Sequence, residues 1–178
     1  IGILVTCNAW NFIDGLNGLS SGYSSLVLFS FLILTSEQNL GQIYTLIAIT
    51  FGVTCGFFII NILTGRVFLG DSGSYFLGMF IGWLGVYIVN NDPNISPWAI
   101  FLIIIYPASE ITVSVFRRVL NIESPFKPDN KHLHSMVYRL ISSKTNLKQL
   151  YANSLSGLLI LILASIPIFY CLTIKGLY

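Results

Sequence analysis

A polar cluster interrupts apolar sequence near the N-terminus, between Asn8 and Leu19. Its polar and glycine positions are Asn8, Asn11, Asp14, Gly15, Asn17 and Gly18. Both Asp14-Gly15 and Asn17-Gly18 form turns readily, because Gly and Asn tolerate positive φ. Polar side chains are costly to bury in a membrane, so such a cluster usually lines a wet cavity or binds a ligand. The pattern predicts a tight bend that directs backbone N–H groups and the Asp14 carboxylate at one point, with an ordinary loop between helices as the alternative.

A second polar segment, Phe-Leu-Gly-Asp-Ser-Gly-Ser, runs from Phe68 to Ser74. Asp71 or Ser72 suits the N-cap of a helix that continues into the membrane. A helix N-terminus favours phosphate, and a carboxylate there could hold a Mg²⁺ ion that also binds the phosphate. The alternative is a plain capped helix whose Gly78 and Gly82 permit close helix packing.

A third polar segment contains two histidines, His132 and His134, next to Lys131. They could be metal ligands, phosphate binders or solvated side chains. Zinc is disfavoured, because its sites want four ligands and no cysteine is near in sequence. Phosphate contact fits better, since this part of the chain also holds Arg117, Arg118 and Lys127. Contact of these cations with anionic lipid headgroups remains the alternative.

The composition places these segments in a membrane protein. Of the 178 residues, 54% are hydrophobic and 9% are charged, and the mean hydropathy is +0.79. Soluble domains carry about 25% charged residues, so we expect an integral membrane protein with no nucleic-acid partner. Three scattered cysteines, Cys7, Cys55 and Cys171, indicate neither a disulfide framework nor a metal site.

The apolar runs predict an all-α polytopic fold with five complete transmembrane helices and an N-terminal helix stub at Ile1–Cys7. The five predicted spans are Gly18–Leu34, Gln42–Ile62, Asp71–Val89, Pro97–Phe116 and Tyr151–Thr173. Pro107 should kink the fourth span. Because the chain begins inside an apolar run without an initiator Met, we expect a fragment of a longer protein.

Charge asymmetry predicts the orientation. Eight of the nine basic residues fall on one side: Arg66, Arg117, Arg118, Lys127, Lys131, Arg139, Lys144 and Lys148. Only Lys175 falls on the other. Basic loops stay in the cytoplasm, so the three polar segments should share the cytoplasmic face.

The ordered motifs Asn8-x-x-Asn11-x-x-Asp14-Gly15-x-x-Gly18-Leu19, Phe68–Ser74 and His132-Leu133-His134 resemble those of the polyprenyl-phosphate N-acetylhexosamine-1-phosphate transferases. These glycosyltransferase family 4 enzymes of the bacterial inner membrane start cell-envelope glycan synthesis, and the histidine pair resembles the GlcNAc-1-phosphate and O-antigen branch. Asn61 and the stretch from Pro107 through Glu110 to Arg118 also match. The resemblance covers essentially the whole chain.

The resemblance implies a single transmembrane catalytic domain over residues 1–178, with cytoplasmic loops at 8–19, 63–71 and 117–150. That domain would be the C-terminal half of a protein with ten or eleven helices. The family's Asp-Asp pair would lie in the other half, so residues 1–178 alone should be inactive. Partners would be UDP-N-acetylhexosamine, polyprenyl (undecaprenyl) phosphate and the membrane, and a homo-oligomer is left open.

The implied reaction moves N-acetylhexosamine 1-phosphate from the UDP-sugar to the lipid phosphate and releases UMP, with Mg²⁺ as cofactor and Mn²⁺ as the alternative. By the same resemblance, Asp71 and Asp14 bind the metal and are catalytic. The catalytic set is completed by His132 and His134. The implied substrate contacts are Asn8, Asn11, Asn17, Asn61, Arg117 and Arg118.

Three positions depart from the family pattern. Asn17 stands where Asp is common, Ser135 stands where a third His is common, and Glu110 stands where many relatives carry Asp. Two other function classes are the alternatives. A transporter or channel fragment would need polar groups at mid-membrane depth, whereas here they fall at helix ends. An inactive scaffold of envelope assembly would not need Asp14, Asp71 and both histidines.

Overall fold

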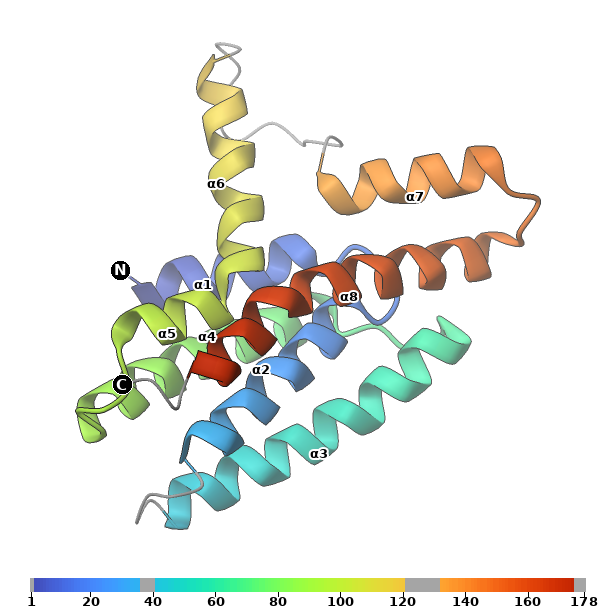
Figure 1. Cartoon of the computed structure of the whole chain (residues 1–178). Coiled ribbons are helices and arrows are strands. Elements are labelled where there is room, and N and C mark those ends of the chain that lie inside the picture. The colour runs from blue at the N-terminus through green and yellow to red at the C-terminus, as the bar shows by residue number, and fades with distance from the viewer. Residues whose placement is uncertain (1, 36–40, 121–131, 175–178) are drawn as a thin grey trace.

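The computed structural model describes residues 2–35, 41–120 and 132–174, and within these ranges the chain is helical and contains no strand. The described residues form eight helices: α1 (Gly2–Ile13), α2 (Leu19–Thr35), α3 (Gly41–Thr64), α4 (Gly70–Asn91), α5 (Pro97–Ile103), α6 (Ile105–Leu120), α7 (Leu133–Lys144) and α8 (Gln149–Ile174) (Figure 1). The predicted all-α fold is confirmed.

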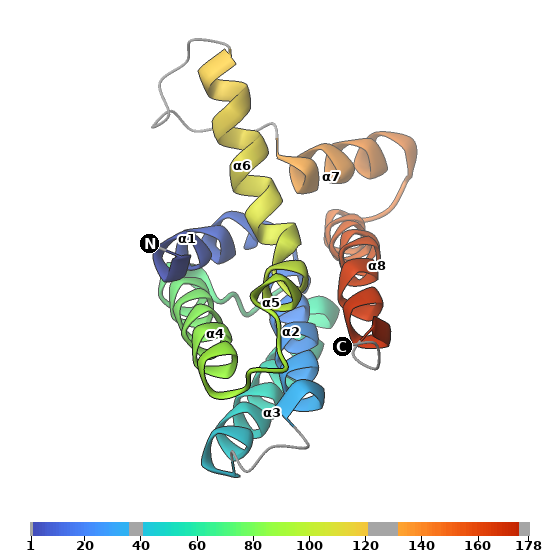
Figure 2. The same ribbon diagram turned by 60° about the vertical axis from the view of Figure 1, so that its left-hand side comes forward.

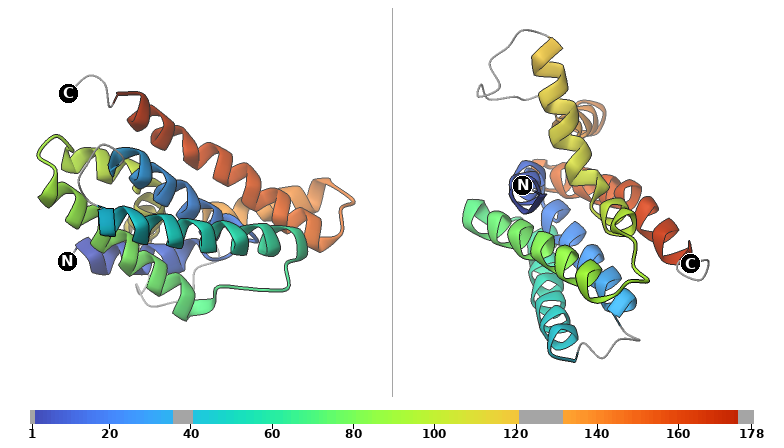
Figure 3. Two further views of the ribbon diagram at one scale, coloured as in Figure 1. Left: turned by 90° about the horizontal axis from the view of Figure 1, so that it is seen from below. Right: turned by 90° about the vertical axis from the view of Figure 1, so that its left-hand side faces the viewer.

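The core forms around α2, which lies between α3 and α8, while α1 packs along α4 (Figures 2 and 3). Thirteen of the seventeen α2 residues are buried. The largest fully buried side chains include Trp10, Tyr23 and Phe31. The indole Nε1–H of Trp10 donates to Ser24 Oγ at 2.6 Å, so the polar atom of this buried ring is satisfied.

The structure supports three or four membrane spans where the sequence predicted five complete ones. Helices α3, α4 and α8 are long and apolar enough to cross a membrane, and α5 with α6 forms a fourth candidate, bent by 74°. Helix α2 has 17 residues, which at about 1.5 Å per residue reach about 26 Å, short of a hydrocarbon core of about 30 Å.

The predicted kink near Pro107 is confirmed as a full break, with Ile104 as the residue between α5 and α6. A proline lacks the N–H that would bond the carbonyl four residues earlier, here that of Ile103. Tyr23 of α2 fills this role, because its hydroxyl donates to Ile103 O at 2.7 Å. Beyond the break, α6 leaves the bundle (Figure 1).

Glycines in α4 allow α1 to approach its backbone. A β-carbon built on Gly78 would lie 2.8 Å from Cys7 Cα and 2.8 Å from Thr6 O, and one on Gly82 would lie 3.2 Å from Thr6 Cβ. The predicted packing role of these glycines is therefore confirmed. A seam between α1 and α4, defined by Gly78 and Gly82 against Thr6 and Cys7, fixes how the two helices lie against each other.

The hydrophilic segment 117–150, predicted as a loop, is partly helical. Helix α6 continues to Leu120, and α7 occupies Leu133–Lys144 beside α8 (Figure 1). Val137 and Ile141 are four residues apart and both face inward, so a short amphipathic helix can pack on the bundle. Residues 8–13 of the first predicted loop likewise belong to α1.

The start of α4 also differs from the predicted N-cap. Leu69 is the N-cap residue, no side chain caps the helix, and Asp71 lies in its first turn. The change leaves the Asp71 carboxylate exposed and available to groups from other elements.

Candidate active site

The end of α1 and the start of α4 are joined by Asn11. Its Nδ2 donates to Asp71 Oδ1 at 2.9 Å and to Ser74 Oγ at 3.1 Å. Ser74 in turn donates to Gly70 O at 2.9 Å. The first two predicted motifs, 60 residues apart, therefore meet through one amide. Ser74 belongs to the second motif but is not among the predicted site residues.

Asp14 stands in the turn between α1 and α2, where its N–H donates to Asn11 O at 3.3 Å. Burial, and secondly the negative charge of Asp71, raise the pKa of Asp14 to about 6. Two carboxylates that repel each other in this way would both be stabilised by a shared cation.

The metal implied by the resemblance can be tested against this donor set. Among the described residues no group of three or more His, Cys, Asp or Glu side chains could hold an ion. Mg²⁺ does not need one, since it commonly uses one or two carboxylates and takes its other ligands from water and substrate phosphates. Asp14 and Asp71 fit that pattern, whereas a zinc site would need more protein ligands.

The two histidines lie next to this turn, at the start of α7. A β-carbon built on Gly15 would lie 2.7 Å from His134 Nε2, so only glycine lets the imidazole approach this closely. His132 is the N-cap residue of α7 and stacks on His134 with ring centroids 5.2 Å apart and planes 8° apart. The rings of His132 and Phe12 also meet edge to face, with centroids 5.2 Å apart.

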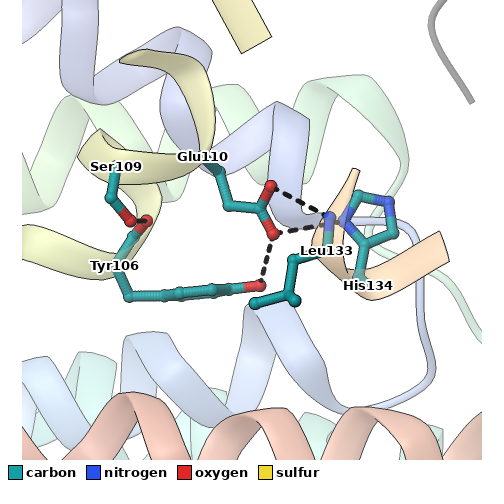
Figure 4. Close-up of polar contacts among 5 residues, drawn as sticks. All are labelled: Tyr106, Ser109, Glu110, Leu133 and His134. Carbon is teal, nitrogen blue, oxygen red and sulfur yellow. Dashed lines mark hydrogen bonds and ion pairs between the residues drawn. The ribbon is translucent and has the colours of Figure 1, made fainter. Parts of the chain in front are cut away.

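Glu110 on α6 faces His134 (Figure 4). Its Oε1 accepts from Tyr106 OH at 3.1 Å, and its Oε2 accepts from the Leu133 N–H at 3.4 Å. His134 Nδ1 lies 3.8 Å from Oε1. Glu110 matches the family stretch but is not among the predicted site residues. A carboxylate inside an apolar predicted span was the signal that could have identified it.

A pocket of about 290 Å³ lies between α6 and α7. Its lining includes Glu110, Ser114, Arg117 and His132. Arg117 therefore lies near one predicted catalytic histidine, while Arg118 is buried in the last turn of α6. Lys127 and Lys131, which supported the phosphate interpretation, fall outside the described residues.

Asn17 and Asn61 lie in a buried clamp that holds the turn in place. The Asn17 N–H donates to Asn153 Oδ1 at 2.7 Å, and its Nδ2 donates to Ser154 Oγ at 3.2 Å. Asn61 Oδ1 accepts from the Gly18 N–H, and Asn61 Nδ2 donates to Val67 O. Both amides are 5% exposed, so in this arrangement they serve the fold rather than an open site.

Asn8 bonds within its own helix, three residues before Asn11. It is exposed, and its Nδ2 donates to Leu4 O of its own helix at 2.8 Å. The structure therefore brings together Asn11, Asp14, Asp71, His132 and His134, places Arg117 and Arg118 at the end of α6, and leaves Asn8 bonded to its own helix.

Comparison with known proteins gives the same identification. Residues 1–89 match the model of glycosyl transferase family 4. The chain is 35% identical over 148 residues to the undecaprenyl-phosphate alpha-N-acetylglucosaminyl 1-phosphate transferase of Thermotoga maritima, covering 83% of this chain and 45% of that protein. It is 32% identical over 128 residues to the probable undecaprenyl-phosphate N-acetylglucosaminyl 1-phosphate transferase of Bacillus subtilis, covering 71% and 36% respectively.

A relative from a second branch is the phospho-N-acetylmuramoyl-pentapeptide-transferase of Moorella thermoacetica, 37% identical over 84 residues, or 47% of this chain and 26% of that protein. No solved structure matches the chain. The chain spans less than half the length of each of these relatives. With half of its own length matching the family model, the chain belongs to glycosyl transferase family 4.

Proposed function

We propose that the protein carrying this chain transfers an N-acetylhexosamine 1-phosphate from a UDP-sugar to undecaprenyl phosphate. An oxygen of the lipid phosphate attacks the β-phosphorus of the UDP-sugar, the bond from that phosphorus to the bridging oxygen breaks, and UMP leaves. The observation that carries this proposal is the joining of Asn11, Asp14 and Asp71 at one point, with His134 against Gly15.

The chain's own residues would act by positioning and by charge. Phosphoryl transfer needs little covalent help from the protein, so fixed groups around the phosphates carry most of the catalysis. Asn11 holds Asp71 in place by its 2.9 Å hydrogen bond, and the turn holds Asp14 beside it. His134, when protonated, would donate from Nε2 to a phosphate oxygen at this turn.

A divalent cation, Mg²⁺ in the first instance, would be held by Asp14 and Asp71. When bound it would neutralise charge on the pyrophosphate. Without it, two carboxylates would repel the phosphates, so the acidic pair makes chemical sense only with a cation. Mn²⁺ uses the same oxygen donors and is the expected substitute.

The lipid substrate would reach the site beside the break between α5 and α6. A pocket of about 400 Å³ is lined there by residues of α1, α4, α5 and α6, including Ala9, Ile81, Pro97 and Phe101. Its apolar lining suits a polyprenyl chain. Ala9 and Trp10 of this lining lie five and four residues before Asp14.

We propose that this site faces the cytoplasm of a bacterial cell and that the reaction initiates a cell-envelope polysaccharide such as an O-antigen. The relatives support the undecaprenyl carrier by their names, and the sugar is proposed as N-acetylglucosamine or a close N-acetylhexosamine. The basic residues of the loops and of α7 support the orientation.

The test is UMP release by the complete protein in membranes, with polyprenyl phosphate and a panel of UDP-N-acetylhexosamines, with and without Mg²⁺. Asp71→Asn should reduce the rate by at least about 100-fold, because the site loses one of the two carboxylates that would hold the charge-neutralising cation. Asp92→Asn is the matched control. It makes the same change at the opposite end of α4 and retains an acceptor for the Asn94 N–H, which now donates to Asp92 Oδ1 at 2.9 Å. Equal rates in wild type and Asp71→Asn would overturn the proposal.

A further inference from the structure

Glu110 occupies a position that the proposed reaction does not explain. It is 8% exposed, it belongs to α6, and no step of the transfer requires it. Burying a carboxylate is costly unless it is hydrogen-bonded, and Glu110 has two donors, Tyr106 OH and the Leu133 N–H. Those two bonds leave open what the carboxylate does for its third neighbour, His134.

His134 has its two ring nitrogens on opposite sides. Nδ1 is buried, has no hydrogen-bond partner among the described residues, and lies 3.8 Å from Glu110 Oε1. Nε2 faces the backbone of Gly15, next to Asp14. Figure 4 shows the imidazole in line with the Glu110 carboxylate. The ring therefore connects α6 with the turn that carries Asp14.

We infer that Glu110 is a positioning residue that keeps the proton of His134 on Nδ1 and so directs Nε2 at the Asp14-Gly15 turn. A carboxylate that accepts from one nitrogen of an imidazole determines which nitrogen remains for a ligand. Tyr106 OH holds the carboxylate from the other side, so the order Tyr106, Glu110, His134 forms one chain of contacts. When the imidazole takes up a second proton, Nε2 becomes a donor that meets a phosphate oxygen, a role that rests on the proposed function.

A purely structural role for Glu110 makes a different prediction. In that case the carboxylate would only satisfy the first turn of α7 through the Leu133 N–H, and its loss would weaken folding without changing the tautomer of His134. The two roles can therefore be separated by a measurement on the imidazole itself.

The direct test is the ¹⁵N spectrum of histidine-labelled protein in lipid nanodiscs, above the pH at which imidazole is charged. The His134 signals are assigned by their loss in His134→Gln. In wild type, Nδ1 should be the protonated nitrogen, whereas free imidazole side chains prefer the proton on Nε2. Glu110→Gln should move His134 toward the Nε2–H form, and Glu110→Asp, which keeps the carboxylate, should largely retain the Nδ1–H form. Thr112→Ala, an exposed change on the same helix, should leave the spectrum unaltered.

The outcome that overturns the inference is an Nε2–H tautomer in wild type, or an unchanged tautomer in folded Glu110→Gln. If Glu110→Gln does not fold, the wild-type spectrum together with Tyr106→Phe decides. Tyr106→Phe should keep the Nδ1–H form while broadening its signal, because the carboxylate loses one of its anchors. This spectrum needs no turnover, so its result stands even if the proposed transferase activity is absent.

Enzyme turnover provides a second test of the role of Glu110. Glu110→Gln should lower the rate of UMP release by about 10- to 100-fold, as is common when a group that orients a functional histidine is removed. In a His134→Gln background, Glu110→Gln should cause no further loss, because both changes act on the same imidazole. Additive losses would indicate a structural role for Glu110 and would contradict the inference.

Discussion

At the scale of residues, the site depends on two carboxylates that repel each other. Asp14 and Asp71 come from different elements, and the Asn11 side chain donates to the carboxylate of Asp71. The fold therefore holds Asp14 in a state that costs free energy when both groups are ionised. Functional sites often carry this kind of local cost, which a ligand relieves.

Asp14→Asn should stabilise the protein without divalent cations while abolishing cation binding. The pKa of Asp14 is raised to about 6, so ionisation of this group disfavours the folded state. The stability that the protonated Asp14 side chain contributes is fully present below about pH 4 and is lost as the pH rises through about 6. The side chain is partly solvated, so we expect only about 1 kcal/mol, or a rise of about 2–4 °C in Tm at pH 7.5 with EDTA.

Thermal unfolding of wild type and variant at several pH values provides the measurement. The difference in Tm should vanish near pH 4, and added Mg²⁺ should stabilise wild type alone. A variant that is less stable than wild type in EDTA at pH 7.5 would show that Asp14 is held by favourable contacts instead.

At the scale of elements, the break between α5 and α6 is kept by a bond from a third helix. Tyr23 OH of α2 satisfies Ile103 O, the carbonyl that Pro107 leaves without its usual donor. The tyrosine ring is fully buried, so no water can replace the hydroxyl at low cost.

Tyr23→Phe should lower stability by about 1–3 kcal/mol, because a buried carbonyl loses the hydroxyl that donates to it. The measurement is the midpoint of thermal unfolding in nanodiscs. Tyr44→Phe is the matched control, since this tyrosine is 40% exposed on α3. Equal midpoints for the two variants would mean that the break does not depend on the hydroxyl.

The sequence predicts some of these helices and not others. Hydropathy located α3, α4 and α8, and Pro107 predicted the break, because these signals are local. Hydropathy did not reveal that α2 is short of a full span. It also did not reveal that Leu133–Lys144 folds as a helix, because α7 gains its stability from packing on α8. Asn17 and Asn61 were predicted as substrate contacts. A buried amide that clamps two loops has the same local sequence signal as one that binds a ligand.

At the scale of the whole molecule, the site is assembled from segments far apart in the chain. The α1–α2 turn, the α3–α4 loop and the α7–α8 loop lie on the same side of the bundle (Figure 1). The four described basic residues outside α6 all belong to this side: Arg66, Arg139, Lys144 and Lys148. The polar turn at residues 92–96 lies at the other end of α4.

This arrangement predicts which loops face the cytoplasm. In protein whose Cys7, Cys55 and Cys171 are replaced, Ser143→Cys at the end of α7 should react with an impermeant maleimide only after the membrane is opened. Asn94→Cys, exposed in the turn after α4, should react in intact cells. The reverse labelling pattern would place the site outside the cytoplasm.

The seam between α1 and α4 limits which substitutions the protein can tolerate during evolution. Gly78 lies seven residues beyond Asp71, about 10 Å along α4, and touches no part of the site. Yet a single added methyl at Gly78 would meet the backbone of α1 at 2.8 Å and must push the two helices apart. Asn11 and Asp71 would then separate, because they sit on the two helices that move. Selection for activity should therefore act on a glycine inside the membrane as strictly as on the carboxylate it aligns.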